Sequence, residues 1–240
     1  MGLYRSYSTA SVINLEHTLS INTDFDGLNS SFIADAIQRL HGPDFVRKHE
    51  LPGFSALTPH AALGYSYTVR VMLATSKTGD ERKRWFDAID GAPPGAFFVI
   101  QAGEDVGGAV FGEMVALRLR AIGLAGAVVD GPSRDIQQIR DIGLPYWTRS
   151  ITMRGMLPDD ADTQVGGDIK IGSAIIRPGD LIAADCDGVV VCPRDKSQDV
   201  LGVARTFRDS EVSTQQQVRS GGKLLQAYPS KTSIKLDEKR

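Results

Sequence analysis

The chain has 240 residues, of which 42% are hydrophobic and 23% are charged; these values exclude intrinsic disorder as its main state and suit one substantial domain. The formal net charge of −2 shows none of the basic excess that is usual in nucleic-acid-binding proteins. No apolar stretch approaches the roughly 20 residues that a membrane span needs, and residues 1–22 lack the features of a signal peptide. We therefore expect a cytoplasmic protein that binds neither nucleic acid nor a membrane.

The N-terminal third predicts two helices and several strands. Residues 29–40 open with a Ser/Asn capping signal and continue at helical spacing, and the His-Gly-Pro sequence at 41–43 ends that helix. Residues 56–75 alternate between apolar and polar positions, which is typical of one or two strands. A short charged helix is expected at 81–89. After a Pro-Pro-Gly turn, the apolar residues 96–100 predict a buried strand.

The middle of the chain alternates between strands and helices. A glycine-rich loop at residues 101–111 precedes a three-turn helix at 112–122, and an apolar strand is expected at 125–129. Residues 130–132 predict a tight turn, and Ser133 is expected to cap a second helix that ends near Asp141. Another strand follows at residues 145–150. This order predicts parallel strands joined by right-handed crossovers.

The last third is predicted to be rich in strands before a long final helix. Strands are expected at residues 168–176, 181–184 and 188–192, a helix over the sheet at 193–219, and a frayed charged tail at 231–240. Cys186 and Cys192 are interpreted as small apolar residues in buried strands that need no disulfide. We expect a single domain over residues 1–240, with an N-terminal arm at about 1–25 and a C-terminal helix and tail at about 194–240.

Common catalytic motifs are absent from the sequence. The four histidines, His17, His41, His49 and His60, lack zinc-ligand spacing. There is no GxSxG nucleophile elbow, and the glycine-rich loop matches neither GxGxxG nor a P-loop. A zinc site built from the histidines, a serine nucleophile elbow and a dinucleotide-binding site are therefore disfavoured.

Two short stretches could carry chemistry. The first, residues 112–115, starts a helix whose free backbone N–H groups could bind a carboxylate, although Glu113 alone could simply favour the helix dipole. The second contains Arg134 and Asp135, which could bind a keto acid and a divalent cation or could form an ordinary surface ion pair. One strand–helix–strand unit separates the two helix starts, so both N-termini can line one crevice, and this geometry favours the functional interpretation.

These stretches belong to a longer segment that resembles a known family. The sequence GEMVALRLRAIGLAGAVVDGPSRDIQQIRDIGLPYW resembles the RraA-like family, which includes 4-hydroxy-4-methyl-2-oxoglutarate aldolases. That family has a G-[ED]-x-x-A helix start, a DGxxRD turn and a GxPV[WF] strand. The separation of 21 positions between Glu113 and Arg134 matches this pattern without insertion. A second block, IGSAIIRPGDLIAADCDGVVVCP, is similar to the family's PGD turn and following strand, so the resemblance covers roughly residues 97–193.

The resemblance implies an α/β fold of the three-layer β/β/α swivelling-domain type, assembled as a homotrimer or hexamer. It also implies a site between subunits in which a divalent cation, magnesium or manganese, holds pyruvate. Glu211 from a neighbouring subunit would complete the metal site, with Asp209 as an alternative.

Residue by residue, the resemblance implies specific roles for the two helix starts. Asp135 would be the metal-site carboxylate, Arg134 would contact the keto-acid oxygens, and Glu113 would support metal-bound water. The substrate carboxylate would be held at Gly112 and by the backbone amides of Met114 and Val115.

The function that follows is a metal-dependent aldolase or lyase. It would release pyruvate from 4-hydroxy-4-methyl-2-oxoglutarate or a related 2-oxo acid, with oxaloacetate decarboxylation as a side activity. Neither motif contains a lysine, which argues against a Schiff base. The alternatives are a non-catalytic RraA-type regulator that binds a ribonuclease or another protein, and an enzyme that uses the same enolate chemistry on an unrelated 2-oxo acid. Nothing in the sequence supports the methyltransferase label attached to some similar sequences.

Overall fold

The computed structural model describes residues 27–102 and 106–228, so the predicted N-terminal arm and frayed tail lie outside the described residues. The strands of its main sheet are β1 (Glu50–Leu51), β2 (Ser55–Ala56), β3 (Ala62–Leu73), β4 (Ala96–Ala102), β5 (Gly126–Ser133), β6 (Tyr146–Ile151), β7 (Ala161–Val165), β10 (Leu181–Ala184) and β11 (Val189–Cys192). Their order is β1-β11-β10-β3-β4-β5-β6-β2, with β7 paired to β3 beside this path. A separate hairpin contains β8 (Ile169–Ile171) and β9 (Ala174–Ile176).

Helices connect and cover these strands. They are α1 (Ser30–His41), α2 (Pro43–His49), α3 (Glu81–Asp90), α4 (Glu113–Ala121), α5 (Ile136–Ile142), α6 (Arg194–Arg219) and α7 (Leu224–Ala227), with a 3-10 turn, η2, at Pro158–Asp160. The first helix ends at Gly42 as expected, but the chain then forms α2, which the sequence did not indicate; Pro43 suits its first turn. Within the described residues, no helix has both the length and the apolar character needed to cross a bilayer.

The strands β3, β4, β5 and β6 lie side by side in parallel, as predicted for the middle of the chain. Helices α3, α4 and α5 make the three connections between them. In β4, Phe97 and Val99 pack on one side of the sheet, whereas Phe98 and Ile100 pack on the other. Both faces of this strand are buried, which explains its continuous apolar run.

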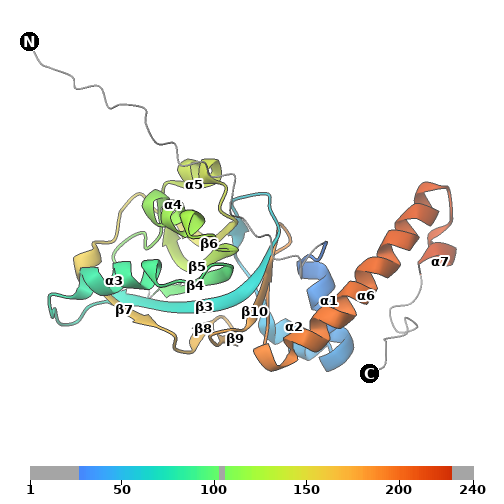
Figure 1. Cartoon of the computed structure of the whole chain (residues 1–240), viewed down its shortest axis with the longest axis horizontal. Helices are drawn as coiled ribbons and strands as arrows, with labels where there is room; N and C mark the ends of the chain where they lie inside the picture. Colours follow the sequence, from blue (N-terminus) through green and yellow to red (C-terminus); the bar gives the residue numbers. More distant parts are fainter. Residues whose placement is uncertain (1–26, 103–105, 229–240) are drawn as a thin grey trace, which may run out of the picture.

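The main sheet is the middle of three layers, which confirms the predicted β/β/α architecture. Helices α3, α4 and α5 cover one face (Figure 1), where an apolar cluster includes Leu119, Val129 and Ile139. The β8–β9 hairpin lies on the opposite face, where Ile171 packs in a second cluster with Trp147. The parallel strands are therefore held rigidly from both sides.

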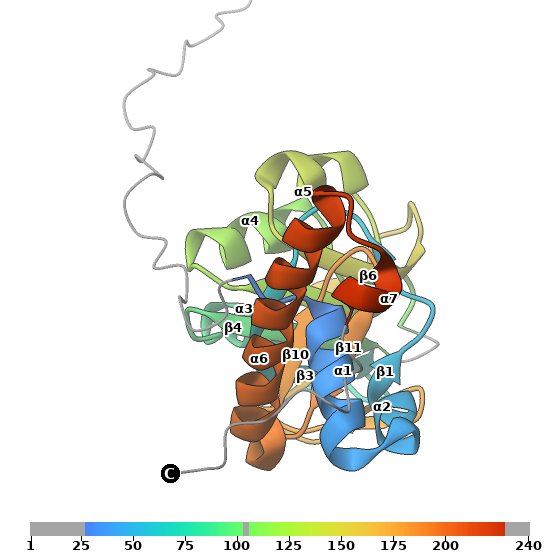
Figure 2. The same ribbon diagram turned by 90° about the vertical axis from the view of Figure 1, so that its right-hand side faces the viewer.

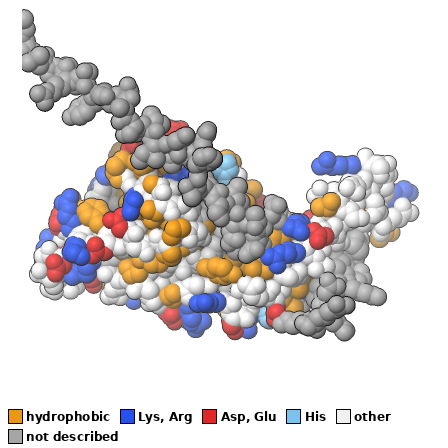
Figure 3. All heavy atoms as spheres, in the orientation of Figure 1, with side chains coloured by type: hydrophobic (Ala, Val, Ile, Leu, Met, Phe, Trp, Pro, Cys, Tyr) orange, Lys and Arg blue, Asp and Glu red, His pale blue; other side chains and the backbone are white. Residues whose placement is uncertain are grey.

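Helices α1 and α6 pack side by side at the antiparallel end of the sheet (Figures 1 and 2). The long helix was expected to lie over the sheet, but only its first half does so, through residues such as Leu201 and Phe207. Beyond Phe207 the helix extends away from the body and meets α7 (Figure 1). Of its last turns, only Thr214 is buried. We call this projecting part, residues 208–228, the arm; it is distinct from the predicted N-terminal arm. Hydrophobic and charged side chains both lie on its surface (Figure 3).

Two local predictions were wrong. Ser133 does not cap a helix: β5 continues through an irregularity between Val129 and Pro132, and Ser133 is its fully buried last residue. The predicted tight turn at residues 130–132 is therefore part of a strand, and Asp135 takes the N-cap position of α5. Cys186 is exposed in a turn after β10 rather than buried in a strand, because β10 ends at Ala184; Cys192 is buried in β11, and both thiols are free.

The division of α6 into a packed half and a projecting half can be tested by truncation of single side chains. Phe207 is 1% exposed and Val212 is 50% exposed. Phe207→Ala should lower the free energy of unfolding by about 3–5 kcal/mol, because it leaves a cavity in the cluster between α1 and β10–β11. Val212→Ala should change it by less than about 0.5 kcal/mol in the monomeric chain. Urea denaturation at low protein concentration measures both values; equal losses would contradict the division.

Candidate active site

Two helix N-termini meet beyond the carboxyl ends of the parallel strands, as the spacing of the motifs predicts. Gly112 is the N-cap of α4 and has no side chain to satisfy the free amides. The carboxylate of Asp135, at the start of α5, takes over that role: its Oδ2 accepts a hydrogen bond of 3.2 Å from the backbone N–H of Glu113. A Cβ at Gly112 would lie 2.7 Å from the same oxygen, so glycine is required for this approach.

Backbone bridges fix the segment between the two helix tips. Phe111 pairs with Ser133 in a parallel bridge, and Arg134 N–H donates to the Phe111 carbonyl at 3.0 Å. On its other side, Ala109 pairs with Gly155. The chain just before α4 is therefore clamped between the end of β5 and the loop that follows β6. These backbone contacts bring the two tips close to each other.

Asp135 has an unusual backbone conformation. Its φ of 58° makes it the only residue other than glycine with a positive φ among those described. The left-handed region is unfavourable for most side chains, although Asp tolerates it better than most. Such conformations cluster at functional sites. Here it turns the chain sharply between β5 and α5, and the turn directs the carboxylate back towards α4.

Arg134 lies beside this carboxylate and is half-exposed. Its Nε is 3.5 Å from Asp135 Oδ2, and 48% of the side chain is exposed to solvent. The guanidinium lies against Gly155, where a Cβ would come within 2.5 Å of Nη1. Sequence reasoning did not identify Gly155, because its role depends on a contact between residues distant in sequence. Its missing side chain leaves room for the arginine.

The first turn of α4 leaves polar groups available. Glu113 is half-buried, and its carboxylate has no hydrogen bond or ion pair with the described residues. The amides of Met114 and Val115 likewise have no acceptor within that part of the chain, as is normal for the first turn of a helix. Free amides and the positive end of the helix dipole together attract an anion. This end of α4 could hold the carboxylate of a small acid.

The donor set at the tips fits a hard divalent cation. Asp135 has a carboxylate oxygen left over after its bond to α4, and Glu113 offers a second carboxylate. Magnesium is typically held by one or two carboxylates and keeps several waters, so this pair is sufficient in number and type. Glu211 and Asp209 lie on α6, at the opposite end of the molecule from α4 and α5 (Figure 1). Within one chain, neither joins the tips.

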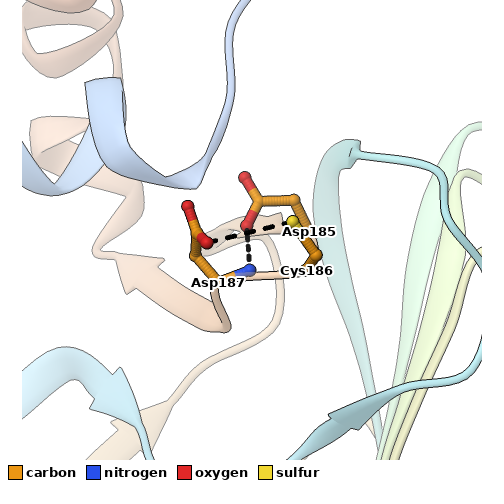
Figure 4. Close-up of side chains that lie close together, drawn as sticks. All are labelled: Asp185, Cys186 and Asp187. Atoms are coloured by element: carbon orange, nitrogen blue, oxygen red, sulfur yellow. Dashed lines mark hydrogen bonds between the residues drawn. The ribbon is translucent and has the colours of Figure 1, made fainter.

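A second acidic cluster, which sequence reasoning did not identify, lies after β10. Ligand atoms of Asp185, Cys186 and Asp187 fall within 4.8 Å of one another (Figure 4). The Asp185 carboxylate, however, already accepts hydrogen bonds from the Ser30 N–H and hydroxyl, each at 2.7 Å, and from the Asp187 N–H at 2.9 Å. It is 7% exposed, and the Asp185 carbonyl accepts the indole N–H of Trp147. These contacts assign Asp185 the role of joining α1 to the sheet.

Comparison with known proteins identifies the family of this chain. Residues 31–191 match the RraA-like family, described as Aldolase/RraA. The chain belongs to the RraA-like family. A relative in Halalkalibacterium halodurans, provisionally named 4-hydroxy-4-methyl-2-oxoglutarate aldolase, is 32% identical over 140 residues. That match covers 57% of this chain and 65% of the relative. Protein DlpA of Legionella pneumophila is 28% identical, and its match covers 69% of this chain and 27% of that protein.

Solved structures share the fold over most of this RraA-like chain. A protein of Pseudomonas syringae pv. tomato, described as uncharacterized, superposes with a TM-score of 0.70 at 25% identity, over 86% of this chain and 95% of its own. Streptomyces coelicolor RraAS2, described as an unusual member of the RNase ES inhibitor RraA protein family, gives 0.65 at 26% identity, over 83% and 96%. The predicted family and fold are thus confirmed.

If Asp185 joins α1 to the sheet, its removal should affect stability far more than removal of its neighbour Asp187. Asp185→Ala should lower the free energy of unfolding by about 3 kcal/mol, because the two buried donors of Ser30 and the N–H of Asp187 lose their carboxylate acceptor. Asp187→Ala, at an exposed residue, should change it by about 0.5 kcal/mol or less. Urea denaturation gives both values. If Asp185→Ala left stability unchanged but removed binding of a divalent cation in calorimetry, the cluster would be a metal site instead.

Proposed function

We propose that this RraA-like protein is a metal-dependent lyase that releases pyruvate from 4-hydroxy-4-methyl-2-oxoglutarate or a related 2-oxo acid. Oxaloacetate decarboxylation is expected as a side activity, because it produces the same enolate. The observation that carries the proposal is the contact of the Asp135 carboxylate with the tip of α4, with the half-exposed Arg134 beside it. Relatives provisionally named as such aldolases support this substrate class.

The first turn of α4 is proposed to bind the carboxylate of the keto acid. The free amides of Met114 and Val115 point along the helix axis, where the dipole adds partial positive charge. Gly112 allows the substrate to approach this backbone closely, since no Cβ stands in the way. These groups would hold the substrate in one orientation without changing their own protonation.

Arg134 is proposed to stabilise the charge that develops during the reaction. In a retro-aldol cleavage the bond between the third and fourth carbons breaks, and its electron pair moves into the enolate of the departing pyruvate. Negative charge therefore grows on the keto oxygen. A guanidinium held in place by Gly155 and Asp135 would meet this charge without reorganising, and such preorganised charge accounts for most of the rate enhancement in many enzymes.

Asp135 and Glu113 are proposed to hold magnesium or manganese at the tips. When bound, such a cation supplies Lewis-acid polarisation of the keto oxygen. The substrate's hydroxyl proton needs an acceptor, for which no further side chain is evident in the two motifs. A water oriented by Glu113 or Asp135 is the proposed base.

A neighbouring copy of the chain is proposed to complete the site in a homotrimer or hexamer. The arm extends away from the body and carries exposed apolar side chains, including Leu224 at 66% and Leu225 at 96%. Exposed apolar groups in one region favour a protein contact. Glu211 lies on this arm and would reach the helix tips of the next subunit, with Asp209 as the alternative. Asp209 already pairs with Arg208, which makes Glu211 the better candidate.

A regulator without catalytic activity is the competing function. The RraA protein family of the structural neighbour RraAS2 is described as an RNase ES inhibitor family. A regulator would need neither the free first-turn amides of α4 nor a cation at Asp135. The two functions therefore differ in whether a small 2-oxo acid is turned over.

Pyruvate release should depend on a divalent cation and on Arg134. A lactate dehydrogenase-coupled assay with 4-hydroxy-4-methyl-2-oxoglutarate and oxaloacetate should show turnover that EDTA abolishes and magnesium restores. Arg134→Ala should lower kcat/KM by about 10²–10³-fold, because it removes a fixed charge that contacts the transition state. Arg118→Ala is a matched control, since Arg118 is also 48% exposed but pairs with Asp90. Turnover that survives exhaustive metal removal would refute the proposal.

Mixing two inactive variants tests the shared site. If Glu211 acts across the interface, Glu211→Ala and Arg134→Ala subunits should each be nearly inactive alone. After equal amounts of the two are unfolded and refolded together, about a quarter of all sites should be active, because a site has intact tips with a probability of about one half and an intact neighbouring arm with a probability of about one half. Asp209→Ala mixed with Arg134→Ala serves as the comparison. No recovery with either partner would place the whole site within one chain.

A further inference from the structure

Three hydroxyl groups are buried together beneath the Arg134–Asp135 turn. Ser133 and Tyr146 have no exposure and Thr148 has 1%. Ser133 Oγ contacts Tyr146 Oη and lies 2.8 Å from Thr148 Oγ1. Thr148 Oγ1 in turn lies 3.1 Å from the carbonyl oxygen of Gly131. A fully buried polar network of this kind specifies one local geometry when all its members are satisfied.

One arrangement of protons satisfies every member. Tyr146 donates to Ser133, Ser133 donates to Thr148, and Thr148 donates to the Gly131 carbonyl. Burial raises the pKa of the Tyr146 phenol, so it remains protonated and able to donate. The chain of donors ends at Gly131, inside the irregular part of β5 that lies just before Arg134. The network therefore holds the backbone that presents the site.

Tyr146 also contacts the other helix tip. Its ring stacks on Phe111 with a centroid distance of 4.4 Å, and Phe111 directly precedes Gly112, the N-cap of α4. Its hydroxyl contacts Ser133, which directly precedes Arg134. One side chain thus touches the residue before each tip.

We propose that Tyr146 is a positioning residue that sets the separation of the two helix tips, through its ring on the α4 side and its hydroxyl on the α5 side. This inference rests on the proposed function for its catalytic consequence, but its structural content can be measured without turnover. Displacements of about 1 Å in a catalytic constellation can cost about a hundredfold in rate. Loss of the hydroxyl alone should therefore affect kcat more than KM.

Tyr146→Phe keeps the ring stack and removes the hydroxyl. We expect kcat to fall about tenfold or more, with KM changed by less than about threefold and the chain still folded. Tyr67→Phe is the control, because Tyr67 packs in the same core cluster beside Phe98 but away from both tips. Ser133→Ala removes the same contact from the other side. Ser133→Ala also removes the bond to Thr148, so the Ser133→Ala/Tyr146→Phe double variant should have the kcat of Ser133→Ala alone, because the bond between Ser133 and Tyr146 is already absent in that variant.

Hydrogen exchange of the Glu113 amide reports the tip separation independently of activity. In the native chain this amide is bound to Asp135 Oδ2. Its exchange, measured by NMR, should accelerate about tenfold in Tyr146→Phe, whereas the amide of Val129 in the middle of β5 should exchange as in the native chain. If exchange accelerates in Tyr146→Phe but the native protein releases no pyruvate, the positioning role is supported and the catalytic function is refuted. Unchanged exchange and unchanged kcat in Tyr146→Phe would overturn the positioning role.

Discussion

The contact between the Asp135 carboxylate and the amide of Glu113 is the interaction on which the site depends. It joins two helix tips that backbone bridges bring close to each other. It requires a left-handed Asp135, a glycine at 112 and a backbone bridge between Phe111 and Ser133. The left-handed Asp135 has a local energetic cost, and position 112 has no side chain. Together with the backbone bridge, these features place a carboxylate at the positive end of α4.

The parallel and antiparallel ends of the main sheet support different parts of the molecule. The parallel strands β3 to β6 are covered on both faces and provide a rigid base for the tips. The antiparallel strands β10 and β11 pack against α1 and the first half of α6 through apolar contacts, and Asp185 additionally joins α1 to the sheet. Because α6 is anchored only over its first half, the arm projects as a helical extension. A fold of this kind can present one site on the rigid end and an assembly surface on the other.

The sequence predicted the parallel half well because its signals are local. Apolar runs such as AFFVI, glycine and proline breakers, and the fixed spacing of the two motifs identify the strands, the helices and the meeting of the tips. It failed where a residue's role depends on a distant partner. Serine is a common helix cap, but Ser133 instead lies at the buried end of a strand, where its hydroxyl hydrogen-bonds to Tyr146 and Thr148. Gly155 and Asp185 gave no local signal, since their partners Arg134 and Ser30 are far away in the sequence.

The charges at the tips give an independent reason for a cation there. Glu113 and Asp135 are two acidic residues beside the single basic residue Arg134, so the three side chains together have a formal net charge of −1. A keto acid is itself an anion, and two unit charges 4 Å apart repel by about 4 kcal/mol at an effective dielectric constant of about 20. The free amides of α4 offset only part of this repulsion, since a helix terminus carries about half an elementary charge. A divalent cation would change the net charge to +1 and make the same site attractive to the substrate, which is why binding of cation and keto acid should be mutually dependent.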